Sequence, residues 1–447
     1  MNVSKTQAFL AALGLAVLLA PAQGVRAAAQ SPEPHYPRAV ATNLGVTRLI
    51  GETDSDAPVS GVQIFVAAGL DRERAGKNGV SALVAECILR TPVTSDLVAV
   101  PLPLREAMTA SGGSITYTVD GRSVHYYIEG RPESIGALLA LVSKAMAQPD
   151  FSTPTLAAAR ASLTARLSAF EGNALSVGIE MFRRSYYATG AAEPALGTIA
   201  TLSGLSSADV QTFYAATYRR AAIAASAAGR LTPDLGRSVS ALANALPDGP
   251  LSAVDERAHP IPAQAPRIVA RRDVQAPWIV VGFAAPPPSS RDFGAMLVLE
   301  SLLSDAFERS SATTLGFVEK SVGAFYLYDS TPASLVVYVN GTEVDPSIAL
   351  RELLVVSKSL SLKPLGPTAL KHFKTAAEGQ FVADTVDLAD RSYLLGAFSS
   401  QGLGSDSINA ALTALQNTTA ADVRRVARNY LQRYIVALVL PRQSDGP

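Results

Sequence analysis

The sequence predicts an α+β protein made of two tandem homologous domains, each an antiparallel sheet with helices packed on one face. Two observations predict it: blocks of sequence recur at a nearly constant spacing, and each half mixes apolar periods of about 3.6 and about 2 residues. Strands grouped in hairpins, with helices between the groups, are typical of this fold class. With 447 residues, 48% hydrophobic and 17% charged, the chain can form well-buried cores.

Three blocks of the N-terminal half recur in the same order in the C-terminal half, two at an offset of 214 residues and one at 213. The blocks are residues 80–89 with 294–303, 132–144 with 346–358, and 208–225 with 421–438. One match alone can be coincidence, but three in order indicate a duplication. We predict domains over residues 33–245 and 267–443, joined by a proline-rich linker over 246–266.

Helices and strands follow from the apolar period of each segment. Apolar residues at helical spacing predict helices over residues 80–89 and 135–146. Short runs of β-branched and aromatic residues predict strands within residues 60–69, 115–130, 223–229, 277–285, 334–341 and 435–441. The Asp120-Gly121 pair predicts a hairpin turn.

The last helix of each predicted domain has a start signal. Ser206 with Asp209, and Thr419 with Asp422, have the spacing of capping boxes, in which a side chain at each end satisfies a free backbone N–H group. Each box therefore predicts where the last helix of its domain begins.

The N-terminus has the three parts of a secretory signal: a positive start with Lys5, an apolar run over residues 8–20, and small residues up to Ala27. A helix needs roughly 20 apolar residues to cross a membrane, so this run is too short for a stable span. We predict a signal peptide over residues 1–27 and an exported, periplasmic protein. The alternative is an uncleaved membrane anchor.

The balance of charges argues against binding to nucleic acid, and the single cysteine and the four histidines are predicted to be structural or loop residues. The 38 basic residues balance the 38 acidic ones, which leaves no basic footprint for nucleic acid. Cys87, the single cysteine, lies on an apolar helical stripe and is predicted to be a core residue. His125 is predicted to be a structural residue of a strand and His372 a residue of a surface helix, while His35 and His259 lie beside prolines in loops.

No familiar catalytic pattern occurs in the sequence. It contains no G-x-S-x-G motif, no serine followed three places later by lysine, no phosphate-binding P-loop motif and no close histidine pair for a catalytic zinc. We therefore assign the chain no catalytic residue and no metal ligand of its own.

Residues 67–92, AAGLDRERAGKNGVSALVAECILRTP, resemble the strand, loop and helix that carry the inverted zinc motif H-x-x-E-H in the pitrilysin/insulinase metallopeptidase family. Residues 195–229 resemble the family's sequence at the end of its first domain, and the pair Gly112-Gly113 also fits. Taken in order, these motifs span roughly the whole chain that follows the predicted signal peptide. The resemblance implies tandem α+β halves.

The resemblance also implies that the zinc chemistry is lost. The first histidine of the motif falls on Ala82, the glutamate base on Ala85 and the second histidine on Glu86. The family's distant glutamate ligand falls on Ala165 or Arg166. Alanine has no donor atom, so we expect no metal here, and we interpret Glu86 as a residue of a solvated helix face.

Some small bacterial members of the family work as two subunits, one with zinc and one with a substrate-binding Arg/Tyr pair. Tyr326 matches that tyrosine, but Glu319 stands at the position of the arginine. Tyr326 and Tyr328 alternate on one strand face, which suits sheet packing as well as substrate contact. With Thr116 and Tyr117, on the strand after the glycine pair, they are the candidate substrate-binding residues.

The resemblance implies a non-catalytic subunit, or pseudo-peptidase, of a periplasmic heterodimeric zinc metallopeptidase. The zinc would belong to a homologous partner subunit, and this chain would help to form the chamber and bind a peptide. Two alternatives stay open: a structural or binding protein of the same fold without a role in proteolysis, and a peptidase with unusual metal ligands. The identity of the peptide, and whether the partner is another homologue or a second copy, stay open as well.

Overall fold

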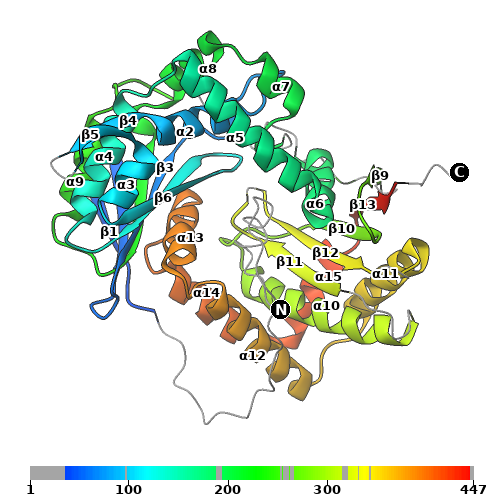
Figure 1. Cartoon of the computed structure of the whole chain (residues 1–447). Helices are drawn as coiled ribbons and strands as arrows, with labels where there is room; N and C mark the ends of the chain where they lie inside the picture. The colour runs from blue at the N-terminus through cyan, green and yellow to red at the C-terminus, as the bar shows by residue number, and fades with distance from the viewer. Residues whose placement is uncertain are drawn as a thin grey trace, which may run out of the picture.

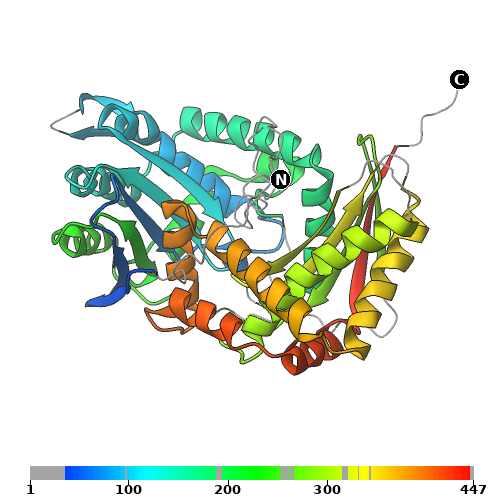
Figure 2. The ribbon, with the colours of Figure 1, turned by 90° about the horizontal axis from the view of Figure 1, so that it is seen from below.

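The computed structural model describes residues 36–95, 98–187, 194–251, 254, 261, 266–314, 321–330, 332–341 and 344–442. The predicted signal peptide, most of the predicted linker, His35, His259 and Glu319 lie outside the described residues. The two halves of the chain lie side by side, each built on its own sheet (Figure 1 and Figure 2).

The N-terminal half has a six-stranded sheet in the order β1-β2-β8-β3-β7-β6, and a separate pair formed by β4 and β5. Its strands are β1 (Val40–Leu44), β2 (Thr47–Thr53), β3 (Ser60–Val66), β4 (Pro92–Ser95), β5 (Val98–Pro103), β6 (Gly113–Val119), β7 (Val124–Gly130) and β8 (Ile223–Gly229). Its helices are η1 (Leu70–Arg72), α2 (Val80–Arg90), α3 (Leu104–Ala110), α4 (Ile135–Ala147), α5 (Thr153–Glu171), α6 (Ala174–Tyr186), α7 (Ile199–Gly204), α8 (Ser207–Thr217), η3 (Arg220–Ala222) and α9 (Leu235–Asn244).

The C-terminal half has a five-stranded sheet in the order β11-β12-β10-β13-β9. Its strands are β9 (Arg267–Arg272), β10 (Trp278–Ala284), β11 (Ser321–Leu327), β12 (Ser334–Asn340) and β13 (Tyr434–Pro441). Its helices are α10 (Phe293–Thr314), α11 (Pro346–Leu362), α12 (Pro367–Ala383), α13 (Leu388–Ser400), α14 (Ser407–Gln416) and α15 (Ala420–Tyr430).

The strand order repeats between the halves. The order β2-β8-β3-β7-β6 of the first sheet corresponds to β9-β13-β10-β12-β11 of the second, and β1 is an addition at the edge. In both sheets the first strand of the repeat pairs in parallel with the last, β2 with β8 and β9 with β13. The other pairs of both sheets are antiparallel, as predicted, so each sheet departs from the prediction only at this one parallel pair, where strands from the two ends of the half run side by side in the same direction.

Each sheet is covered on both faces. On one face of the N-terminal sheet, buried residues of β3 and β7 pack with α2 and α4 in one hydrophobic core. On the other face lies α13, a helix of the C-terminal half, against β3 and β8 (Figure 1). In return, α6 of the N-terminal half packs against β10 and β13. The prediction of helices on one face of each sheet is thus incomplete, because each half supplies a helix to the other half's sheet.

Small residues make this exchange of helices possible. Gly282 of β10 lies beneath the ring of Phe182 of α6, and Gly396 of α13 lies against the ring of Phe65 of β3. An added Cβ at either glycine would fall well inside van der Waals distance of the facing ring. Each glycine therefore leaves the space that an aromatic side chain of the other half fills.

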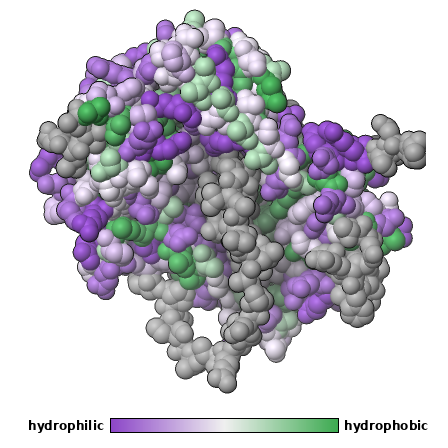
Figure 3. Space-filling view, viewed as in Figure 1, coloured by the Kyte–Doolittle hydropathy of each residue, from purple (hydrophilic) through white to green (hydrophobic). Residues whose placement is uncertain are grey.

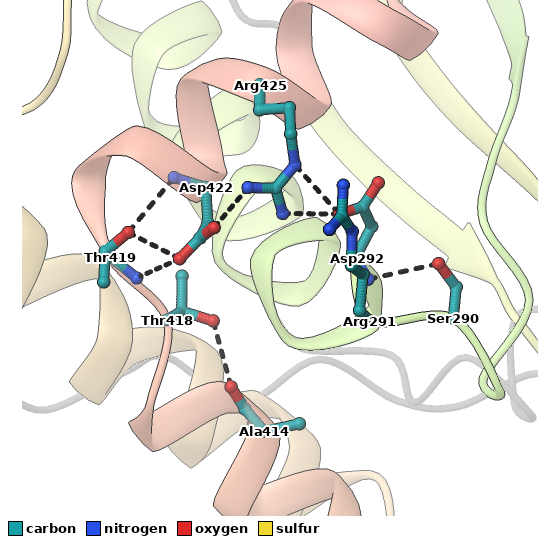
Figure 4. A network of polar contacts seen from close by, with 8 residues as sticks. All are labelled: Ser290, Arg291, Asp292, Ala414, Thr418, Thr419, Asp422 and Arg425. Atoms are coloured by element: carbon teal, nitrogen blue, oxygen red, sulfur yellow. Dashed lines mark hydrogen bonds and ion pairs between the residues drawn. The ribbon is translucent and has the colours of Figure 1, made fainter.

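Both predicted capping boxes are present, which confirms the predicted starts of α8 and α15. Only α15 is the last helix of its half, because α9 follows α8 in the N-terminal half. At α15, Thr419 Oγ1 accepts a hydrogen bond from Asp422 N at 3.2 Å, and Asp422 Oδ2 accepts one from Thr419 N at 3.0 Å. Arg425 donates to Asp422 and, at 2.5 Å, to Asp292 beside the start of α10 (Figure 4). The start of α15 is in this way joined to α10 by a charged contact.

On the face of the molecule that Figure 3 shows, hydrophobic residues lie among hydrophilic ones. Exposed large hydrophobic residues include Val40, Val46, Val100, Ile199, Val269, Ile348, Val355, Leu362 and Val386. Among the described residues, no helix has both the length and the apolar run that a membrane span requires.

Candidate functional site

The helix that matches the zinc-motif helix is α2, and its three motif positions are all buried. Ala82 and Ala85 have no exposed surface, and Glu86 is 1% exposed. The helix begins after Gly79, whose positive φ of 90° suits glycine. The carboxylate of Glu73 accepts hydrogen bonds from Gly79 N and Ser81 N, and so satisfies the start of the helix.

Glu86 lies at the centre of a buried charged cluster. Its Oε1 accepts a hydrogen bond from Arg90 Nη2 at 2.9 Å, and its Oε2 accepts one from the Tyr117 hydroxyl at 3.1 Å. Arg105 and Arg166 each bring a guanidinium nitrogen within 3.9 Å of Oε2. The prediction that Glu86 lies on a solvated helix face is therefore wrong, since its arginine partners compensate the cost of burying a carboxylate.

Tyr117 connects the two oppositely charged groups of this cluster. Its hydroxyl donates to Glu86 and accepts a hydrogen bond from Arg166 Nη1 at 2.6 Å. The Arg166 guanidinium also lies 4.9 Å from the centre of the Tyr117 ring, a cation–π contact. Burial raises the pKa of Tyr117 well above its usual value, so the phenol keeps its proton and stays a donor.

The residues at this position do not fit a zinc ion. Two of the three motif positions are alanine, and the single carboxylate is already held by arginines, whose positive charge opposes a cation. Arg166, on α5, brings a guanidinium nitrogen to 3.9 Å from the carboxylate of Glu86. Within the part of the chain that the structure describes, no group of three or more potential ligands is placed to hold a metal ion.

Cys87, next to this cluster, is a core residue as predicted, with no exposed surface. Burial, with a smaller contribution from the nearby Glu86 carboxylate, raises the pKa of its thiol to about 12. The thiolate is therefore not formed near neutral pH, which excludes Cys87 as a nucleophile.

The two histidines inside the described residues have the predicted structural character. His125 is 8% exposed and forms a three-ring cluster with Phe65 and Tyr393, whose centroids lie 5.6 and 4.7 Å from its own. Burial lowers the pKa of His125, which favours the neutral ring. His372 is exposed on α12.

The tyrosines predicted to touch substrate in the C-terminal half are core residues. Tyr326 has no exposed surface and its hydroxyl donates to the carbonyl of Pro286, while Tyr328 is 4% exposed. Their rings share one face, as predicted, with centroids 5.3 Å apart, but that face belongs to the hydrophobic core. The prediction of substrate contact is corrected for both, because neither presents a surface to a ligand.

The edge strands β6 and β11 differ in whether their outward backbone N–H groups already have hydrogen-bond partners. On β11, the backbone N–H groups of Ala324 and Tyr326 donate to Ser304 Oγ at 3.0 Å and Glu300 Oε1 at 2.9 Å, both on α10. Glu300 is the counterpart of Glu86 in the duplication. Its carboxylate thus accepts from an edge N–H group of β11, whereas the hydrogen bonds that Glu86 accepts within the described residues come from the side chains of Arg90 and Tyr117.

The edge strand β6 carries the other two candidate residues. Thr116 is exposed, and Tyr117 is 6% exposed and held in the Glu86 cluster. Since side chains alternate along a strand, Thr116 faces α13 and Tyr117 faces α2. Thr116 can therefore meet a ligand at the edge of β6, while Tyr117 acts through packing.

A cavity of about 170 Å³ opens between the halves, next to the end of β6. Apolar side chains from both halves line it, among them Phe170 of α5, Met181 of α6 and Phe325 of β11, and Arg166 forms part of its wall. Mostly apolar cavities with a few polar groups are the usual form of ligand sites. Sequence reasoning missed this cavity, because α6 reaches it only through its packing on the other half.

Comparison with known proteins identifies the fold. No protein-family model matches the chain, and no curated protein matches its sequence. Solved structures do match: the inactive domain of a peptidase M16 from Pseudomonas fluorescens superposes with a TM-score of 0.77 at 14% identity, over 92% of this chain and 100% of that one.

Two further solved structures agree. A protease from Helicobacter pylori has a TM-score of 0.78 at 15% identity, covering 91% of this chain and 100% of its own. An M16-like peptidase from Alicyclobacillus acidocaldarius has a TM-score of 0.74 at 15% identity, covering 92% of this chain and 100% of its own. The chain therefore has the two-domain α+β fold of M16 peptidases, which confirms at the level of the fold the resemblance inferred from the sequence.

Proposed function

We propose that this chain is a non-catalytic subunit of a two-subunit, exported zinc peptidase, in which a homologous partner supplies the zinc and the hydrolysis. The chain would form one wall of the chamber and hold a peptide for the partner. The fold supports the class of protein, and the predicted signal peptide supports export.

The observation that carries the proposal is the charged cluster at the former zinc position. Ala82 and Ala85 offer no donor, and Glu86 is held by Tyr117 and by three arginines. Such a cluster stabilises the helix pair α2 and α5 without metal. The fold is thus kept while the hydrolytic chemistry is absent from these positions.

The edge of β6 supports a role in peptide binding. An extended peptide can add to an exposed sheet edge, where main-chain hydrogen bonds supply affinity and side-chain pockets supply specificity. The edge of β11 already has partners on α10, so β6 is the better docking edge of the two. The cavity beside the end of β6 would receive an apolar side chain of that peptide.

The test uses a homologue that carries H-x-x-E-H, sought first among the genes beside that of this chain. Each chain is purified alone, and peptide hydrolysis is measured for each and for their mixture, with zinc determined on every sample. We expect a complex with one zinc-bearing subunit and a hydrolysis rate well above that of the homologue alone. A mixture that forms no complex and gains no activity would overturn the proposal.

Two controls separate the alternatives. This chain alone, incubated with zinc, should bind less than one ion per chain, and a chelator should not change its residual peptide cleavage. Stoichiometric zinc with chelator-sensitive cleavage would instead establish a peptidase with unusual ligands. Purification from the exporting cell with a partner that is not a homologue would favour a structural or binding protein.

A further inference from the structure

The outer edge of the C-terminal sheet is open at β9. This strand is the last of its sheet, and among the described strands its one neighbour is β13, with which it pairs in parallel. It lies at the periphery of the molecule (Figure 1). In the N-terminal sheet the corresponding strand, β2, has a further antiparallel strand, β1, on its outer side. The duplication therefore indicates that this edge of the fold can accept an added strand.

The backbone of β9 presents hydrogen-bonding groups to such a strand. The carbonyls of Pro266 and Arg272 accept hydrogen bonds from the N–H groups of Val436 and Arg442 beside them, each at 2.9 Å. In a parallel pair alternate residues bond to the same neighbour, so the even-numbered residues of β9 face β13. The backbone groups of residues 267, 269 and 271 therefore point outward, away from the sheet.

The side chains of the same three residues form an exposed basic face. Arg267, Val269 and Arg271 are all exposed, Val269 to 50%. Arg271 donates to the carbonyl of Pro441 at 3.1 Å, which is a neutral partner, and within the described residues neither arginine forms an ion pair. Residues 267–273 contain three arginines and one acidic residue, so this face has a net positive charge.

The two exposed arginines determine which kind of strand can add to β9. In an antiparallel pair of two copies centred on Val269, Arg267 of each copy would lie opposite Arg271 of the other. Like charges directly opposite each other destabilise a strand pair, so the edge disfavours a second copy of this chain. A strand with carboxylates at these two positions would instead place each of them opposite an arginine, with Cβ atoms about 5 Å apart.

We propose that the edge of β9 binds an extended, acidic segment of another protein, which adds to the sheet as an antiparallel strand. The segment would have the pattern acidic-x-apolar-x-acidic. Its two carboxylates would pair with Arg267 and Arg271, and its apolar side chain would cover Val269. Because β9 belongs to the other sheet from β6, this is a second docking surface, beyond the proposed function.

The experiment measures peptide binding to the full chain by fluorescence anisotropy. The probes are two fluorescein-labelled peptides, TETVTET and TQTVTQT, which differ only in the charge of two side chains. Two cross-strand ion pairs predict that the glutamate peptide binds about twofold to thirtyfold more tightly than the glutamine peptide. The difference should shrink in about 1 M salt, because exposed charges are screened there.

Variants of β9 test the two parts of the assignment separately. The double substitution Arg267→Gln and Arg271→Gln should remove the preference for glutamate and keep the binding of the glutamine peptide. Val269→Pro removes one outward N–H group and leaves the bonds to β13 in place, and should abolish the binding of both peptides. Arg237→Gln, which removes a guanidinium with 81% side-chain exposure on α9, is the control for net charge and should change neither affinity.

The outcomes distinguish strand addition from simple attraction of anions. Equal affinities for the two peptides, or a preference for glutamate that survives the double substitution, would overturn the proposal. Binding that depends on the arginines but is unaffected by Val269→Pro would establish attraction without strand addition, and would overturn it as well. None of these variants alters β6, so the proposed function keeps its own separate test.

Discussion

Replacement of Tyr117 by phenylalanine tests whether its hydroxyl bridges Glu86 and Arg166 in the charged cluster. The substitution keeps the ring and its packing and removes only the hydroxyl, which donates to Glu86 at 3.1 Å and accepts from Arg166 at 2.6 Å. Hydrogen bonds to charged groups each contribute about 1.5–3 kcal/mol to stability.

The two ends of this bridge recover differently after the change. Glu86 is 1% exposed and cannot regain the lost bond from water, although Arg90 still holds its other oxygen at 2.9 Å. Arg166 has 22% of its side chain exposed and can be hydrated in part. We therefore expect the free energy of unfolding to fall by about 2–4 kcal/mol, the loss of one charged hydrogen bond and part of a second.

The assay is urea denaturation followed by far-UV circular dichroism, with an unchanged m-value as the sign that only stability has altered. Tyr214→Phe is the matched control, because its hydroxyl donates to a neutral carbonyl, that of Met146, at 2.6 Å. That change should cost about 0.5–1.5 kcal/mol. A loss for Tyr117→Phe no larger than for Tyr214→Phe would refute the assignment of a bridging role to Tyr117.

Three further measurements address other parts of the molecule. Gly396→Ala should lower the free energy of unfolding by about 1–3 kcal/mol, because its Cβ would meet the Phe65 ring. Gly379→Ala, in open space on α12, is the control and should raise the free energy of unfolding by up to about 1 kcal/mol. Equal effects of the two substitutions would contradict the packing of α13 on β3. Burial, opposed by Arg391, raises the pKa of Glu52 from 4.5 to about 7, so the folded state holds this proton more tightly than the unfolded state does. The free energy of unfolding should therefore fall as the pH rises from 4.5 to 7, and a Glu52→Gln variant should not show this decrease. An equal decrease in the variant would contradict the role of Glu52. The thiol of Cys87 should stay unreactive toward Ellman's reagent in the folded chain at pH 8 and react fully in urea; rapid labelling of the folded chain would contradict its burial.

Local signals predicted the individual elements well. The apolar stripes placed α2 and α4, the two capping boxes placed the starts of α8 and α15, and the Asp120-Gly121 pair placed the turn between β6 and β7. Each of these signals acts within about four residues, through side-chain spacing or a side chain bonded to a nearby backbone group. Such short-range effects can be read from sequence.

The environment of Glu86 could not be predicted in the same way. The helix position suggested a solvated carboxylate, but Tyr117 comes from β6 and Arg166 from α5. Their meeting depends on how β6 and α5 pack around α2, which no local pattern records.

The amino-acid sequence by itself determined the duplication, the α+β class and the absence of donor atoms in the side chains of Ala82 and Ala85, because each depends on residue identity and spacing alone. Only the tertiary structure decided that α6 and α13 exchange between the halves, that β11 is satisfied by α10, and that Glu86 pairs with arginines. These features arise from contacts between residues far apart in the chain. Their free energy depends on distance and burial in three dimensions, which the spacing of residues along the sequence does not contain.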